Sequence, residues 1–114
     1  MEISKPIEFE GDSLDVIREL PSDAMDSVGY QLDRVQQGKE PNDWKPMATI
    51  GPGVKEIRVQ EESGAFRVFY VATFPEAIYV LHVFTKKTQQ TEKRHIDLAK
   101  ERFKNLKKDR SKKI

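Results

Sequence analysis

The sequence predicts an α+β domain whose elements follow the order β-α-α-β-β-β-α. Residues 12–38 carry apolar side chains at steps of three and four, which is typical of amphipathic helices. Residues 54–84 contain three alternating or apolar runs separated by turn residues. Residues 92–107 return to helical spacing. We therefore expect an antiparallel sheet backed by an N-terminal helical hairpin, with a C-terminal basic helix.

The first element is predicted as an edge strand or extended arm. Apolar residues alternate weakly over Glu2–Glu10, and Pro6 excludes a central place in a sheet because it lacks a backbone N–H. Two helices follow, and Pro21 separates them. The second helix carries an apolar stripe at helical spacing and ends near Gly38. The stripe consists of Met25, Val28, Leu32 and Val35.

Residues 39–53 are predicted as a loop, because they contain three prolines and two glycines. Trp44 in this loop is interpreted as a packing anchor. The strands expected next are Val54–Gln60, Ala65–Thr73 and Ala77–Phe84, and the middle one is the most apolar and therefore central.

The final helix is expected over Glu92–Lys107, with a narrow apolar stripe of Ile96, Ala99 and Phe103. Residues 107–114 lack such a stripe and are predicted to form a flexible basic tail. With 114 residues and no internal repeat, the chain is expected to form one domain, 1–114.

Composition excludes several classes of protein. Without cysteine there can be no disulfide and no thiolate metal site. His82 and His95 lie far apart in the sequence and show no metal-ligand spacing, so we expect neither a metal nor a cofactor. No apolar run approaches the ~20 residues of a membrane span, and the N-terminus lacks the apolar core of a secretion signal. A cytoplasmic protein is the simplest expectation.

Charge is distributed unevenly along the chain. Residues 1–53 hold five Lys and Arg against eleven Asp and Glu, whereas residues 54–114 hold fifteen against eight. A concentrated basic half indicates an anionic partner such as nucleic acid. Solvated helix faces would give the same composition, so composition alone leaves both interpretations open.

Strand alternation brings five polar residues to one face of the predicted sheet. Hairpin loops of two or four residues pair even-numbered with odd-numbered positions, and cross-strand partners share a face. The predicted set is Glu56, Arg58, Arg67, His82 and Lys86. A bulge or a three-residue loop would break this parity.

Each member of this set has a structural interpretation beside a functional one. Arg67 lies in an otherwise apolar strand, where it needs either an ion pair with Glu56 or a role as a phosphate clamp. His82 is more readily a hydrogen-bonded core histidine than a catalytic base, and His95 is expected at the surface. Lys86 and Lys87 follow a buried strand, where they can hold a polyanion or form a solvated pair.

Taken together, four segments resemble the phage-derived HigB-like toxins of the RelE/ParE superfamily. The similarity spans nearly the whole chain, and these segments occur in order within it: Asp43-Trp44-Lys45-Pro46-Met47, Gly51-Pro52-Gly53-Val54-Lys55-Glu56-Ile57-Arg58-Val59, Phe66-Arg67-Val68-Phe69-Tyr70, and Leu81-His82-Val83-Phe84-Thr85-Lys86-Lys87-Thr88-Gln89. The resemblance implies the RelE-like βααβββα fold. It also implies the toxin of a type II toxin–antitoxin pair, which acts as a ribosome-dependent mRNA endonuclease (an mRNA interferase) and inhibits translation.

The resemblance also implies roles for particular residues. Arg58 and Arg67 match the family's sheet arginines, and Lys86 and Lys87 match its strand-end lysines. Together with His82, a lower-ranked base candidate, these form the expected catalytic set of a metal-independent endoribonuclease. The final helix would contact ribosomal RNA, through Lys93, Arg94, Lys100 and Lys104.

The implied partners are the ribosome, mRNA and a helix-turn-helix antitoxin of the HigA-like kind. Two other functions stay open at this point. ParE-like members of the superfamily inhibit a topoisomerase without cutting RNA, and a phage-derived copy can be an inactive interaction protein.

Overall fold

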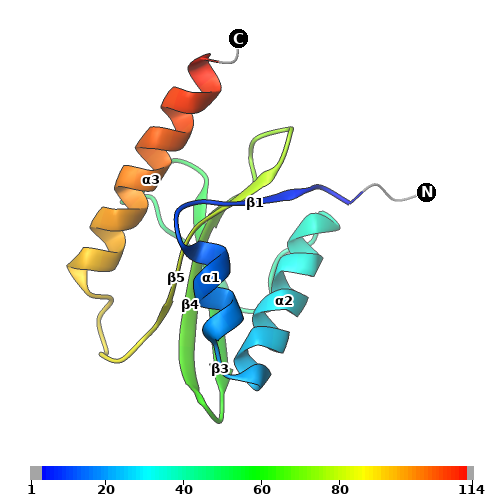
Figure 1. Ribbon diagram of the computed structural model, residues 1–114, viewed down its shortest axis with the longest axis vertical. Helices are drawn as coiled ribbons and strands as arrows, with labels where there is room; N and C mark the ends of the chain where they lie inside the picture. Colours follow the sequence, from blue (N-terminus) through cyan, green and yellow to red (C-terminus); the bar gives the residue numbers. More distant parts are fainter. Residues whose placement is uncertain (1–3, 113–114) are drawn as a thin grey trace.

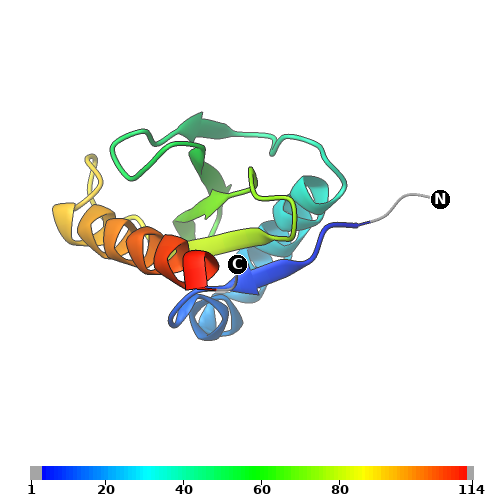
Figure 2. The ribbon, with the colours of Figure 1, turned by 90° about the horizontal axis from the view of Figure 1, so that it is seen from above.

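The computed structural model of the chain describes residues 4–112 and places a five-stranded sheet between two layers of helix (Figure 1). The N-terminal hairpin covers one face, and the C-terminal helix lies on the other side (Figure 2). The elements are β1 (Ile7–Phe9), α1 (Ser13–Glu19), α2 (Ser22–Gln36), β2 (Trp44–Pro46), β3 (Val54–Glu61), β4 (Gly64–Val71), β5 (Ile78–Thr85) and α3 (Lys93–Lys112). No helix in the described range is long and apolar enough to cross a membrane.

The strands lie in the order β1-β5-β4-β3-β2, so β4 is central, as its apolar sequence predicted. The predicted antiparallel pairing holds for β2, β3, β4 and β5 but was wrong for β1, which pairs with β5 in parallel. The chain enters at one edge and then crosses the sheet through the helical hairpin to begin β2 at the other edge. The direction of β1 is therefore set by the path of the chain across the sheet, and the residues of β1 do not specify it.

The loop predicted over residues 39–53 contains a short edge strand, β2, which pairs with β3. Met47 and Ile50 from the same loop are buried in the core beneath α3. The loop approaches this helix so closely that a β-carbon at Gly51 would lie 2.1 Å from the Phe103 ring. Glycine is therefore required there because of the close contact between loop and helix.

The sheet has a separate core on each face. On one face, the predicted stripe of α2 packs against β3, β4 and β5, with Val28, Leu32 and Val35 buried and Met25 partly buried. On the other face, α3 contributes Ala99, Phe103 and Leu106. The helical hairpin predicted from sequence is thus confirmed.

The C-terminal prediction was wrong in its boundary. Residues 107–112 of the predicted flexible tail continue α3 as a helix, and 113–114 lie outside the described residues. Leu106 is buried at this end. Arg110 donates two hydrogen bonds to the Glu76 carboxylate, at 2.6 and 3.0 Å, and lies 3.9 Å from the centre of the Phe74 ring. These tertiary contacts hold the last turns of a segment that lacks an apolar stripe of its own.

We predict that Leu32→Ala lowers the free energy of unfolding by ~2–5 kcal/mol, because truncating a buried leucine removes apolar contacts and leaves a cavity. Leu32 is 4% exposed and central to the hairpin core. Urea unfolding followed by circular dichroism measures the change. Asp26→Ala on an exposed position of the same helix is the matched control and should stay within about 0.5 kcal/mol of the parent. Equal stabilities for the two variants would contradict this account of the core.

Candidate functional site

The β3–β4 and β4–β5 ladders bring two arginines together on the α3 side of the sheet. Arg58 lies directly opposite Arg67, and Arg67 lies opposite Phe84 on β5. The prediction that these residues share one face of the sheet holds for Arg58, Arg67 and His82. His82 pairs with Phe69. A β-bulge shifts the register between Phe69 and Tyr70 and therefore affects only the ladder beyond them. Because α3 packs along β5, two strands from β3, it leaves Arg58 partly exposed.

Glu56 makes this arginine pair possible. Two like charges directly opposite each other destabilise a sheet unless an anion lies between them. The Glu56 side chain is 1% exposed, and its Oε1 accepts a hydrogen bond from Arg58 Nε at 3.2 Å. Arg67 Nε and Lys45 Nζ each lie 3.9 Å from the same oxygen. Three cations thus surround one carboxylate, and the cluster keeps a positive excess.

The ion pair expected between Arg67 and Glu56 is present but long. Arg67 is held instead by a hydrogen bond from its NH1 to the Phe66 carbonyl, at 2.9 Å. Within residues 4–112, Glu56 Oε2 and Arg67 Nε are buried without a hydrogen-bond partner. The unpaired Nε of Arg67 is buried beside Glu56, so only the terminal nitrogens of this guanidinium could reach an anion.

The two strand-end lysines differ in their surroundings. The Lys86 N–H donates to the Ala65 carbonyl at 2.8 Å, next to the last pair of the β4–β5 ladder. Strand alternation places Lys86 on the same face as Arg67 and one row further along, and it is half-buried. Lys87 is exposed and lies beyond β5. Of the two, Lys86 is the better candidate to act with the arginines.

The structure brings together the two histidines that the sequence separated. His82 Nε2 and His95 Nδ1 are 2.8 Å apart, and the His95 ring stacks on Phe84 with 4.0 Å between ring centres. His82 is confirmed as a hydrogen-bonded core histidine, whereas the surface position expected for His95 was wrong. The loop after β5 turns the chain back, so the first turn of α3 lies against the strand it has just left.

The hydrogen bonds around His82 fix where its proton lies. Arg102 can only donate, and its NH1 lies 3.4 Å from His82 Nδ1, so that nitrogen accepts. The proton is then on Nε2 and is donated to His95. Arg102 is itself held by Asp12 at 2.8 Å and by the Leu81 carbonyl at 3.0 Å. This network joins α1, β5 and α3.

The network also affects the protonation and the exposure of His82. Burial, followed by the charges of His95 and Arg102, lowers the pKa of His82 to about 4. Burial likewise lowers the pKa of His95. Both ring nitrogens of His82 are engaged and the residue is 6% exposed. These contacts favour a structural role for His82, and its candidate role as a base stays a prediction.

The four basic residues singled out on the last helix all lie on its exposed surface. Lys93 pairs with Asp97 and Arg94 with Glu92, while Lys100 and Lys104 are also exposed. Such surface ion pairs contribute little to stability, so these side chains remain available to a partner.

Sequence reasoning missed Lys45, Asp12 and Arg102. Lys45 lies in a segment predicted as a loop, where no strand alternation was expected. Asp12 and Arg102 are far apart in the sequence, and their pairing depends on how α3 docks beside α1. No local sequence signal identifies the contact of Lys45 with Glu56 or the contact of Asp12 with Arg102.

Comparison with known families gave one finding. A family model described as Phage derived protein Gp49-like (DUF891) matches residues 15–104, which include both arginines and both histidines. Among proteins of curated function, the search found no match to the chain.

The buried histidine predicts how stability depends on pH. In the unfolded chain His82 would bind a proton near its ordinary pKa of 6.5, whereas in the folded protein its pKa is about 4. As pH falls from about 6.5 towards 4, the unfolded state gains protons that the folded state does not. We therefore expect stability to decrease, by at most about 1.4 kcal/mol per pH unit for this group.

Urea unfolding at pH 7.0 and pH 5.0, values we choose to include about 1.5 pH units of this window, tests that expectation. The His82→Gln variant keeps an amide near His95 but has no titrating ring, so its loss of stability between the two pH values should be smaller than the parent's. Equal losses in both proteins would show that His82 does not carry the effect.

Proposed function

The chain belongs to the Gp49-like family of phage-derived proteins, and we propose that it is the toxin of a type II toxin–antitoxin pair that cleaves mRNA on the ribosome. The observation that carries this proposal is the arginine pair on β3 and β4. Arg58 and Arg67 lie side by side on paired strands, and the cluster around them has a net positive charge. The buried Glu56 carboxylate holds Arg58, and the Phe66 carbonyl holds Arg67. A phosphate of an RNA backbone fits the charge and the planar donors of this pair.

The proposed reaction needs no metal ion. The ribose 2′-oxygen attacks the adjacent phosphorus and loses its proton, while the bond to the 5′-oxygen breaks and that oxygen gains a proton. The products are a 2′,3′-cyclic phosphate and a 5′-hydroxyl. Arg67 and Arg58 would stabilise the negative charge that develops on the phosphoryl oxygens.

Other residues support this role without touching the reacting bond. Glu56 orients the guanidinium of Arg58, and Lys86 adds positive charge in the next row of the same face. Lys87, being exposed, would contact the RNA backbone nearby. The ribosome would supply the alignment of the mRNA, which is consistent with a protein face that carries charge stabilisation but no exposed histidine pair.

Helix α3 provides a second basic surface. Lys93, Arg94, Lys100 and Lys104 are exposed along it, and contacts of this kind bind ribosomal RNA through its phosphates. In this proposal α3 docks the protein on the ribosome, while the arginine pair acts on the mRNA.

We predict that Arg67→Ala abolishes growth arrest and transcript cleavage. Loss of one such contact to the transition state typically costs about 10²–10³ in rate. Arg67→Lys should fail as well, because an ammonium cannot reproduce a bidentate phosphate contact. The matched control is Arg18→Ala, which removes an exposed arginine from α1 and should leave activity unchanged.

The measurement is induction of each variant in cells, followed by mapping of transcript 5′ ends. Cuts in phase with codons for the parent and Arg18→Ala, but not for the Arg67 variants, are expected. DNA damage without cuts would instead support a ParE-like inhibitor of a topoisomerase, and no effect of the parent would support an inactive interaction protein. Normal cleavage by folded Arg67→Ala would leave Arg67 with a structural role only.

A toxin of this kind requires a cognate partner. We predict that a neighbouring gene encodes a small helix-turn-helix protein of the HigA-like kind that binds this chain and represses the pair's transcription. Co-expression should restore growth, and the complex should weaken with salt where basic residues form its rim. Failure to restore growth together with failure to co-purify would contradict the pairing.

A further inference from the structure

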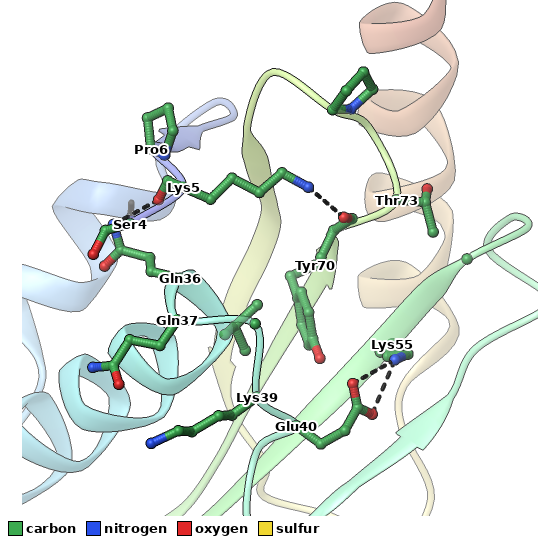
Figure 3. A pocket seen from close by; sticks show the side chains of 15 residues that line it. Ser4, Lys5, Pro6, Gln36, Gln37, Lys39, Glu40, Lys55, Tyr70 and Thr73 are labelled. Carbon is green, nitrogen blue, oxygen red and sulfur yellow. Dashed lines mark hydrogen bonds and ion pairs between the residues drawn. The ribbon is translucent and has the colours of Figure 1, made fainter. Parts of the chain in front are cut away.

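A cavity of about 580 Å³ lies on the hairpin side of the sheet (Figure 3). Strand alternation places the arginine pair on the opposite face. Its walls come from three parts of the chain: residues 4–6 before β1, residues 35–40 at the end of α2, and the ends of β3 and β4 with the loop that follows. Its size is within the range of pockets that bind small ligands or side chains. Nothing in the proposed cleavage reaction uses it.

Specific contacts between distant segments hold the cavity's shape. The Lys5 N–H donates to the Gln36 carbonyl at 3.0 Å, and Gln36 Nε2 donates back to the Lys5 carbonyl at 2.9 Å. Lys5 Nζ reaches across the cavity to the Ala72 carbonyl at 2.6 Å. On another wall, Lys55 Nζ contacts both carboxylate oxygens of Glu40. The hollow is therefore a built feature and does not depend on one loose loop.

The floor and the rim differ in chemistry. The apolar floor lies over Val35 and Tyr70, which belong to the buried core. Its accessible apolar lining comes from Ala72, Pro6 and Pro75. The rim carries Lys5, Lys39 and Lys55 against one acid, Glu40, which Lys55 already neutralises. The remaining charge on the rim is positive.

Tyr70 adds a hydrogen-bond donor to the floor. Burial, and next the charge of Glu40, raises the pKa of Tyr70, so its hydroxyl keeps its proton. Within residues 4–112 that hydroxyl has no hydrogen-bond partner. An acceptor group of a bound ligand could therefore use it.

The positions of the lysines distinguish between ligands. A phosphate would need several donors converging on one point, but the three ammonium groups lie on separate walls (Figure 3). Separated cations around an apolar floor match separated carboxylates around one apolar side chain. We propose that this cavity is a docking site for a short acidic peptide segment of a partner protein, whose single apolar side chain occupies the floor.

This proposal does not depend on the proposed cleavage of RNA, and its test uses neither RNA nor ribosomes. The probes are acetylated seven-residue peptides of Asp and Glu that carry one central Leu, Ile, Phe or Trp. Matched peptides with Asn and Gln in place of the acids are the controls. Each is titrated into the ¹⁵N-labelled full chain, and amide shifts are followed by NMR.

We expect saturable shifts at residues 36–40 and 70–73 with at least one acidic peptide, and none with the amide controls. Lys39→Glu reverses a charge on the exposed rim and should weaken binding at least about tenfold. Tyr70→Phe should weaken it severalfold. Lys108→Glu makes the same charge change on exposed α3 and should leave binding unchanged.

Four outcomes would overturn the proposal. The first is that no acidic peptide gives a saturable shift at about 1 mM, which corresponds to the weakest useful affinity, and the second is that the shifts are confined to α3. The third is that Lys39→Glu and Lys108→Glu weaken peptide binding equally. The fourth is that adenosine monophosphate binds at these residues and none of the peptides does. The last result would identify a nucleotide pocket instead.

Discussion

Strand β5 has to be buried on both faces, and most of the architecture follows from that constraint. Seven of its eight residues, Ile78–Phe84, are buried. An apolar run of this kind is stable only when both faces of the sheet are covered. Helix α1 packs on one face of β5 and α3 on the other, while β1 occupies its open edge. Because α3 packs along β5, it does not cover the same face of the sheet at β3. That part of the face is open to other contacts.

The candidate site occupies that less covered part of the sheet. A buried carboxylate is costly unless charges and hydrogen bonds compensate it. Glu56 is compensated by three cations, yet one of its oxygens and one nitrogen of Arg67 have no hydrogen-bond partner within residues 4–112. Both atoms are buried, so neither can contact a bound anion. The capacity of this face to bind one depends on the more exposed cations of the cluster, Arg58 and Lys45.

The two faces of the sheet therefore differ in chemistry as well as in packing. On the α3 side, rigid strands carry the arginine pair, and the histidine network ties α3 to β5 and α1. On the hairpin side, the end of α2 and the segment before β1 enclose a cavity with a cationic rim. A partner that binds this cavity would leave the arginine face uncovered, so the two surfaces can be studied with separate variants.

The sequence by itself determined the order of the main elements, the stripe of α2 and the face shared by Arg58, Arg67 and His82. These features depend on local periodicity, because each side chain of a strand can point to only one of the two faces of the sheet. Only the tertiary structure decided the parallel pairing of β1, the helical end of α3 and the meeting of His82 with His95. Each of these depends on contacts between residues distant in the chain, such as Arg110 with Glu76 and Arg102 with Asp12, whose energies no local pattern encodes.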